Sequence, residues 1–296
     1  MIAASQPGHF TTRPPNKKTA GSGDNVPKAT IDGIELYYEQ VDASPYWQPP
    51  KTPILFIHGL STDHTIWERQ VAALMKERAV VTVDVRGHGR SAKPRGDVYQ
   101  IADHARDMLG LLRHLGYAKT HVVGVSMGGM IAQQMALRSP DLIASLSLIC
   151  TSCEPAKEGA TLEWRLGVFD KASDLAGYYK PVLDRGLGKN MPQALRDHMY
   201  QLAIHNSRDI QRSGMIATFS YNARDEIGGI KVPALVVGGA EDGSIPPHLS
   251  EQLTSMISNA KLEILPGCGH GPYYEAPEAL NNALMKFIAS QERGTA

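Results

Sequence analysis

The feature that most constrains the fold is a regular alternation of short apolar runs with stretches of helical periodicity. Residues 53–57, 79–83 and 121–125 are apolar runs of strand length, and a helical pattern follows each of them. Runs of this kind are typical of strands buried on both faces, and their alternation with helices predicts a mostly parallel sheet flanked by helices. Five further strands complete a predicted sheet of eight: 29–31, 34–38, 145–149, 232–237 and 261–265.

Two regions depart from this alternation. Residues 1–28 are rich in Gly, Pro, Ser, Thr and Lys without periodic apolar positions, which predicts a flexible N-terminal tail. Residues 153–224 carry helical patterns with no strand between them, which predicts a helical cap inserted into a core formed by 29–152 and 225–296. Asp32–Gly33, between the first two strands, predicts a tight hairpin.

Composition excludes several classes of function. The formal net charge is zero, so nothing attracts the chain over long range to nucleic acid or an anionic membrane. No window approaches eighteen consecutive apolar residues and no signal peptide is recognisable, so we expect a soluble, cytoplasmic protein. There are three cysteines, Cys150, Cys153 and Cys268, and so small and odd a number argues against a disulfide framework. No second motif completes a zinc site with Cys150 and Cys153.

The strongest chemical signal is Gly124–Val125–Ser126–Met127–Gly128, which matches G-x-S-x-G. It lies between the apolar run HVVGV and the helical pattern of 127–138. In that context the motif predicts a strand-to-helix elbow that holds Ser126 in a strained conformation above the sheet edge. The flanking glycines are needed because side chains there would clash in so tight a turn. Ser126 is therefore the candidate nucleophile.

A serine hydroxyl needs a base, and His270 is the best candidate among eleven histidines because it lies in a Gly-rich loop after a predicted strand. His58 and His88 are also loop residues, but both precede the serine. The orienting acid is expected between serine and histidine, at the carboxyl end of a strand. Asp242 fits that position, and Glu241 is its alternative.

An oxyanion hole needs two backbone N–H donors beside the nucleophile. Met127 supplies one at the N-terminus of the helix after the elbow. The loop His58–Gly59–Leu60 follows the first parallel strand, and the Leu60 N–H is the second candidate.

Taken together, five stretches resemble the α/β-hydrolase superfamily, and they cover the predicted core from residue 29 to the C-terminus. They are PILFIHGLSTDHTIW, VVTVDVRGHGRSAKP, HVVGVSMGGMIAQQMAL, VPALVVGGAEDGSIPP and LPGCGHGPYYEAPE. The resemblance implies an α/β-hydrolase fold with a helical cap, a Ser126–Asp242–His270 triad, and an oxyanion hole at Leu60 and Met127. More loosely, GVSMGGMIAQ and YQIADHARDMLGLLRHLGYAKTHVVG resemble 3-oxoadipate enol-lactonases and related small esterases.

The resulting hypothesis is a serine hydrolase that cleaves a small carboxylic ester or lactone and needs no metal or organic cofactor. The alternatives are a carbon–carbon bond hydrolase of the meta-cleavage type, a cofactor-free peroxidase, and a ligand receptor on a hydrolase scaffold. The meta-cleavage enzymes usually carry asparagine where Val125 stands, so this difference weighs against them. Haloalkane dehalogenases and epoxide hydrolases use aspartate at the position of Ser126, so the serine disfavours both. Neither the natural substrate nor the oligomeric state follows from the sequence.

The cap is expected to shape the substrate pocket. Arg165 and Arg212 are candidates for binding a substrate carboxylate, as the acid of a lactone requires. The apolar candidates for the pocket wall are Trp164, Phe169, Tyr178, Met215 and Phe219.

Overall fold

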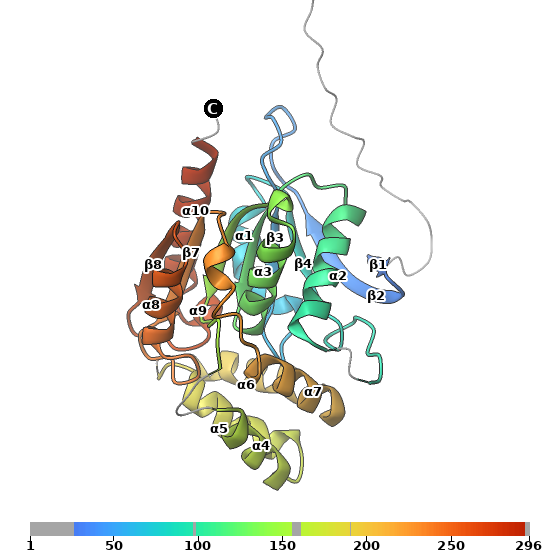
Figure 1. Ribbon diagram of the computed structural model, residues 1–296, viewed down its shortest axis with the longest axis vertical. Coiled ribbons are helices and arrows are strands. Elements are labelled where there is room, and N and C mark those ends of the chain that lie inside the picture. The colour runs from blue at the N-terminus through green and yellow to red at the C-terminus, as the bar shows by residue number, and fades with distance from the viewer. Residues whose placement is uncertain (1–26, 97–98, 156–160, 190, 294–296) are drawn as a thin grey trace, which may run out of the picture.

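In the computed structural model, the described residues form a central sheet of eight strands in the order β1-β2-β4-β3-β5-β6-β7-β8 (Figure 1). Residues 27–96, 99–155, 161–189 and 191–293 are described. The predicted tail therefore lies outside them, apart from its last two residues. The strands are β1 (Lys28–Ile31), β2 (Ile34–Val41), β3 (Ile54–Ile57), β4 (Val80–Val83), β5 (Thr120–Val125), β6 (Ile143–Ile149), β7 (Ala234–Gly239) and β8 (Ala260–Leu265).

The direction of the strands follows the predicted pattern. β1 and β2 form an antiparallel hairpin around Asp32 and Gly33, which both have positive φ, as a type I′ turn requires. β2 is also antiparallel to β4, and every later pairing is parallel. The predicted fold class, a mostly parallel sheet of the α/β-hydrolase type, is confirmed.

Helices cover both faces of the sheet because its central strands are apolar on both sides. Within β3, Leu55 and Ile57 join the apolar core on one face, and Ile54 and Phe56 join the core on the other. On the first face lie α2 (Ile101–His114), α3 (Met127–Arg138) and α8 (Pro247–Met256). On the second lie α1 (Glu68–Leu74) and α10 (Pro277–Glu292), which contact each other. Within the described part of the chain, no helix is both long and apolar enough to cross a membrane.

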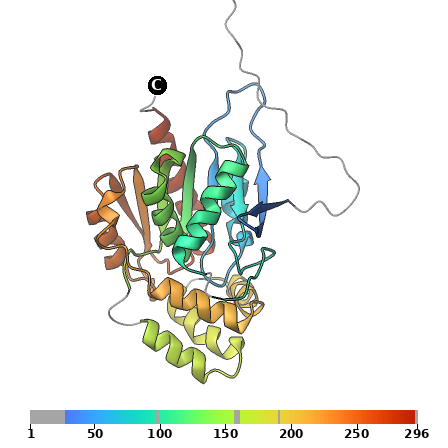
Figure 2. The same cartoon turned by 45° about the vertical axis from the view of Figure 1, so that its right-hand side comes forward.

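Four helices between β6 and β7 pack beside the carboxyl ends of the strands, as two views of the molecule show (Figures 1 and 2). Phe169, Tyr178, Tyr179, Ala203 and Met215 form a small apolar core among them. The helices are α4 (Leu162–Lys171), α5 (Leu175–Gly186), α6 (Gln193–Ile204) and α7 (Arg208–Phe219). We call these four helices the cap.

Three of the four cap helices begin at a side-chain N-cap, supplied by Thr161, Asp174 and Ser207. Periodicity predicts a helix from residue 172, but α5 begins at Leu175 because the Asp174 carboxylate accepts from the Gly177 N–H. Ser207 caps α7 in the same way, through the Ile210 N–H. Periodicity predicts that this helix runs from residue 208 to residue 223, but it ends at Phe219, and Ala223 instead donates its N–H to the Cys153 carbonyl of the core.

Three buried histidines lie near one another beside the ends of β3 and β4. Burial lowers the pKa of His58 and of His104, and it lowers that of His88 to about 3. His58 Nε2 accepts from the Val85 N–H, so the ring is neutral with its proton on Nδ1. These side chains therefore stabilise the fold only while they remain uncharged.

We predict that stability falls with pH below about 6.5, because the unfolded chain then binds protons that the folded chain excludes. Each fully excluded histidine contributes up to about 1.4 kcal/mol per pH unit in that range. His104→Leu removes one of the three groups, so its urea midpoint should decline less steeply between pH 7.5 and 5.5. The pKa of His64 is raised by its hydrogen bond to Asp84 despite burial. Its contribution to the free energy of unfolding is therefore fully present below pH 6.5 and is lost only as the pH rises above that value. Identical slopes for variant and wild type contradict the prediction.

Candidate active site

The elbow predicted at Ser126 is present. Ser126 follows β5 and immediately precedes α3, and its backbone lies at φ 54° and ψ −118°. Its N–H donates to the Ile149 carbonyl of β6 at 2.9 Å, which holds the turn against the neighbouring strand. An L-residue adopts such a conformation only when the surrounding structure enforces it.

Two glycines make this turn possible by letting three backbone segments approach closely. A Cβ on Gly124 would lie 2.2 Å from the Gly128 carbonyl oxygen. A Cβ on Gly128 would lie 2.3 Å from the Ile57 carbonyl oxygen at the end of β3. These contacts are with backbone, which cannot move aside. The elbow therefore packs directly against the end of β3.

The loop after β3 approaches Ser126. A Cβ on Gly59 would lie 3.4 Å from the Ser126 Cβ. The backbone at Gly59 and Leu60 therefore passes beside the serine. Met127 opens α3, and the first N–H groups of a helix have no partner within it. The two backbone segments predicted to hold the oxyanion donors, at Leu60 and Met127, therefore flank Ser126.

The buried Asp242 is paired with His270, which is partly exposed. His270 Nδ1 lies 2.7 Å from Asp242 Oδ2. The other carboxylate oxygen of Asp242 accepts from the Ser244 and Ile245 N–H groups, both at 2.8 Å. These bonds fix the carboxylate and direct it at the ring. A neutral imidazole with its proton on Nδ1 keeps Nε2 free to accept a proton.

The rival residues lie elsewhere. The Glu241 side chain is exposed, and its backbone N–H donates to the Cys268 carbonyl. His58 donates from Nδ1 to the Gly59 carbonyl and accepts at Nε2 from Val85. His88 is fully buried beside it, with ring centroids 5.2 Å apart.

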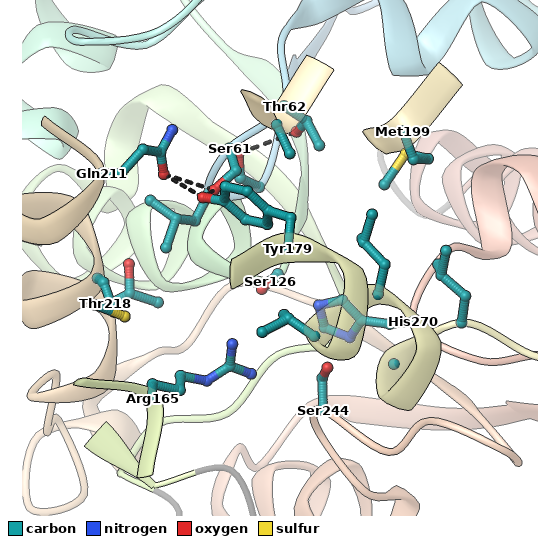
Figure 3. Close-up of a pocket in the computed structure, with 18 of the residues that line it drawn as sticks. Ser61, Thr62, Ser126, Arg165, Tyr179, Met199, Gln211, Thr218, Ser244 and His270 are labelled. Carbon is teal, nitrogen blue, oxygen red and sulfur yellow. Dashed lines mark hydrogen bonds between the residues drawn. The ribbon is translucent and has the colours of Figure 1, made fainter. Parts of the chain in front are cut away.

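Ser126 and His270 border one cavity of about 90 Å³ between the core and the cap (Figure 3). Among the described residues no hydrogen bond joins Ser126 Oγ to the His270 ring. Nucleophile–base contacts of this kind often tighten only when substrate is bound. Leu60 and Ser61 line the same cavity from the loop after β3.

The sequence matches the family model described as "Alpha/beta hydrolase family" over residues 54–283. The chain belongs to the alpha/beta hydrolase family. It is 28% identical over 267 residues to a protein of Caulobacter sp. (strain K31) named "Putative carbamate hydrolase RutD", which covers 88% of this chain and 98% of that protein.

Solved structures place the chain among hydrolases of similar shape. The enol-lactonase of Burkholderia xenovorans LB400 superposes with a TM-score of 0.81 at 28% identity, covering 89% of this chain and all of that one. A thermophilic esterase from Thermogutta terrifontis superposes with a TM-score of 0.79 at 25% identity, covering 89% of this chain and 98% of that one. The predicted resemblance to enol-lactonase-like hydrolases is confirmed.

The cap brings only part of the predicted pocket wall to the cavity of this hydrolase. Tyr178, Met215 and Phe219 line it. Phe169 is buried inside the cap, edge-on to Tyr178, because its helix turns that face toward α5. Trp164 is half-buried beneath the Arg185 guanidinium and is not among the residues that line the cavity.

The two candidate arginines lie in different environments. Arg165 is buried and lines the cavity, and its guanidinium lies 3.9 Å from the Phe219 ring centroid. Burial lowers its pKa. Arg212 instead is exposed and lies 3.6 Å from Asp170, outside the residues that line the cavity. Helical periodicity alone cannot predict which of the two arginines is buried, because both lie on amphipathic cap helices.

In the part of the chain that the structure describes, two clusters of side chains have ligand-type atoms that all lie within 4.8 Å of one another: Cys150, Asp242 and His270, and Asp63, His64 and Asp84. In each cluster the histidine is hydrogen-bonded to one aspartate: His270 to Asp242 at 2.7 Å, and His64 to Asp84 at 2.8 Å. This is the geometry of a histidine oriented by a carboxylate rather than of ligands spread around an ion.

Sequence reasoning missed Glu275, which ties the histidine loop to the cap. Its carboxylate accepts from the N–H groups of Gly188, Gly269 and Gly271 at 2.8–2.9 Å. His270 itself donates its N–H to the Gly186 carbonyl at the end of α5. The only sequence signal for this role was the acidic residue soon after a Gly-rich loop.

The strain at Ser126 yields a stability prediction. Ser126→Gly should be more stable than Ser126→Ala by about 1–3 kcal/mol, because glycine alone adopts this backbone conformation without steric cost. Both variants remove the hydroxyl, so the comparison isolates the backbone. The measurement is the free energy of unfolding in urea, and an alanine variant as stable as the glycine variant contradicts a strained elbow.

Proposed function

We propose that this hydrolase cleaves carboxylic esters or lactones of small molecules through an acyl-enzyme, with Ser126 as nucleophile, His270 as base and Asp242 as orienting acid. The observation that carries the proposal is the cavity at which the elbow serine and the Asp242-bonded imidazole meet. Serine, histidine and acid also follow in the chain order of this fold.

In the first half of the cycle, Ser126 Oγ attacks the carbonyl carbon and His270 Nε2 takes its proton. The tetrahedral oxyanion accepts hydrogen bonds from the Leu60 and Met127 amides, each worth on the order of 3 kcal/mol. Asp242 holds the ring in the tautomer that can accept at Nε2 and stabilises the imidazolium that forms. His270 then gives the proton to the leaving oxygen as the acyl bond breaks.

In the second half, a water molecule loses a proton to His270 Nε2 as its oxygen attacks the acyl carbon. Collapse of the second tetrahedral intermediate returns the proton to Ser126 Oγ and releases the acid. In a lactone the leaving oxygen remains attached to the acyl group, so a single product leaves.

The size of the cavity and the names of the relatives support a small substrate. A volume near 90 Å³ accommodates an acyl group of a few heavy atoms. A relative named as an enol-lactonase supports a lactone or ester. The relative named "Putative carbamate hydrolase RutD" makes a carbamate the second candidate, since its carbonyl carbon is open to the same attack.

A substrate panel separates these candidates from one another and from a carbon–carbon bond hydrolase or a receptor. It comprises p-nitrophenyl acetate, an aliphatic lactone, a carbamate ester and a vinylogous diketone. We expect kcat/KM to be highest for the ester or the lactone. A preference for the diketone instead indicates a carbon–carbon bond hydrolase, and turnover of none of them indicates a receptor.

Ser126→Ala should reduce kcat for p-nitrophenyl acetate by about 10³–10⁶-fold without unfolding the protein. The physical reason is the loss of the attacking oxygen while the fold and cavity remain. Steady-state kinetics together with circular dichroism of the same preparation make the test. Near-normal turnover by the folded variant refutes the assignment.

Asp242→Asn should lower kcat by up to about 10⁴-fold, because an amide stabilises the wrong histidine tautomer. Glu241→Gln is the matched control, since it makes the same chemical change one residue earlier on an exposed side chain. We expect the control to retain wild-type kcat. The reverse ranking of the two variants shows that the acid is Glu241.

A further inference from the structure

Ser61 is held in a conformation that serine avoids. Its φ is 70°, in the left-handed region where a Cβ is sterically unfavourable. The residue is buried at 4% exposure and directly follows Leu60, the proposed oxyanion donor. The chain there runs from β3 past the nucleophile, so the conformation of Ser61 affects the direction of the peptides before it.

Two cap side chains hold Ser61 in place (Figure 3). Its hydroxyl lies within hydrogen-bonding distance of the Tyr179 hydroxyl and donates to Gln211 Oε1 at 2.7 Å. Tyr179 OH also donates to the same Gln211 oxygen, at 2.6 Å. Tyr179 belongs to α5 and Gln211 to α7, and both are buried. We call Ser61, Tyr179 and Gln211 the cap latch.

The neighbouring Leu60 side chain is seated on the cap as well. Its Cδ1 lies 2.8 Å from where a Cβ on Gly214 would be, so α7 leaves room for it. Leu60 packs against the apolar cores of both the sheet and the cap. The loop that passes beside Ser126 is therefore fixed from the cap side by one apolar contact and one hydrogen-bonded cluster.

We propose that the cap latch sets the catalytic geometry of the oxyanion loop, so that Tyr179 and Gln211 act as positioning residues through Ser61. The proposal rests on the proposed function, in which the Leu60 N–H binds the oxyanion. Without the latch, Ser61 relaxes toward negative φ and the preceding peptide turns with it. An N–H displaced by about 1 Å stabilises the transition state far less well.

A direct substrate contact is the competing explanation, because the latch residues also line the cavity. The two explanations differ in what glycine does at position 61. Glycine adopts φ 70° without any support from the cap, but it offers no hydroxyl to a substrate. Ser61→Gly therefore preserves the loop, whereas Ser61→Ala loses the hydroxyl and keeps the steric cost.

The experiment measures kcat and KM for p-nitrophenyl acetate in both position-61 variants, in Tyr179→Phe, and in the double variant Tyr179→Phe/Ser61→Gly. Ser61→Ala and Tyr179→Phe should lower kcat by about 10–100-fold with KM changed less than about 3-fold. Ser61→Gly should stay within about 3-fold of wild type and should rescue Tyr179→Phe. Tyr200→Phe, on α6 outside the residues that line the cavity, is the matched control and should leave kcat unchanged.

Two results overturn the proposal. If Ser61→Gly is as impaired as Ser61→Ala and KM rises in both, the hydroxyl binds substrate. If Tyr179→Phe lowers only the melting temperature and kcat is unchanged, the latch merely fastens the cap. Labelling of wild-type Ser126 by a fluorophosphonate separates this failure from that of the proposed function, since a wild type that does not label refutes the nucleophile itself.

Discussion

The arrangement of the site depends on one close approach of backbone to backbone. The elbow at Ser126 packs its Gly128 onto the end of β3 and its Gly124 onto the first turn of α3. A methyl group at either glycine would overlap a carbonyl oxygen, so Ser126, the N-terminus of α3 and the end of β3 are fixed relative to one another. Because the loop after β3 continues through Leu60 into Ser61, the same constraint places both segments of the proposed oxyanion hole.

Around this rigid centre, the remaining parts are held by hydrogen bonds between segments far apart in sequence. Asp242 is fixed by two N–H groups of its own turn, and His270 is fixed by Asp242 and by the Gly186 carbonyl. Glu275 joins the histidine loop to the cap, and the cap latch joins the cap to the oxyanion loop. The cap therefore contacts both the histidine loop and the loop proposed to hold the oxyanion. We infer that its helices contribute to the geometry of the reaction as well as to the shape of the pocket.

Local patterns in the sequence were sufficient for the core but not for the cap. Apolar runs predicted the central strands because these are buried on both faces, and the Asp32–Gly33 turn predicted the hairpin of β1 and β2. Cap helices pack on several sides, so periodicity does not tell which face meets the cavity. Phe169 and Met215 are equally apolar and equally buried, yet only Met215 lines the cavity. The contact between Ser61 and Gln211 spans 150 residues and leaves no local signal. The position at a strand end favoured Asp242 over its neighbour Glu241 in the sequence, but the hydrogen bond from His270 to Asp242 and the exposure of Glu241 are seen only in the structure.

The most direct test of the account is a crystal structure of the protein after reaction with a small phosphonate that mimics the tetrahedral intermediate. The account predicts phosphorus bonded to Ser126 Oγ, the phosphonyl oxygen about 3 Å from both the Leu60 and Met127 nitrogens, and His270 Nε2 turned toward the modified serine. A phosphonate attached to another residue, or an oxygen pointing away from both amides, contradicts it.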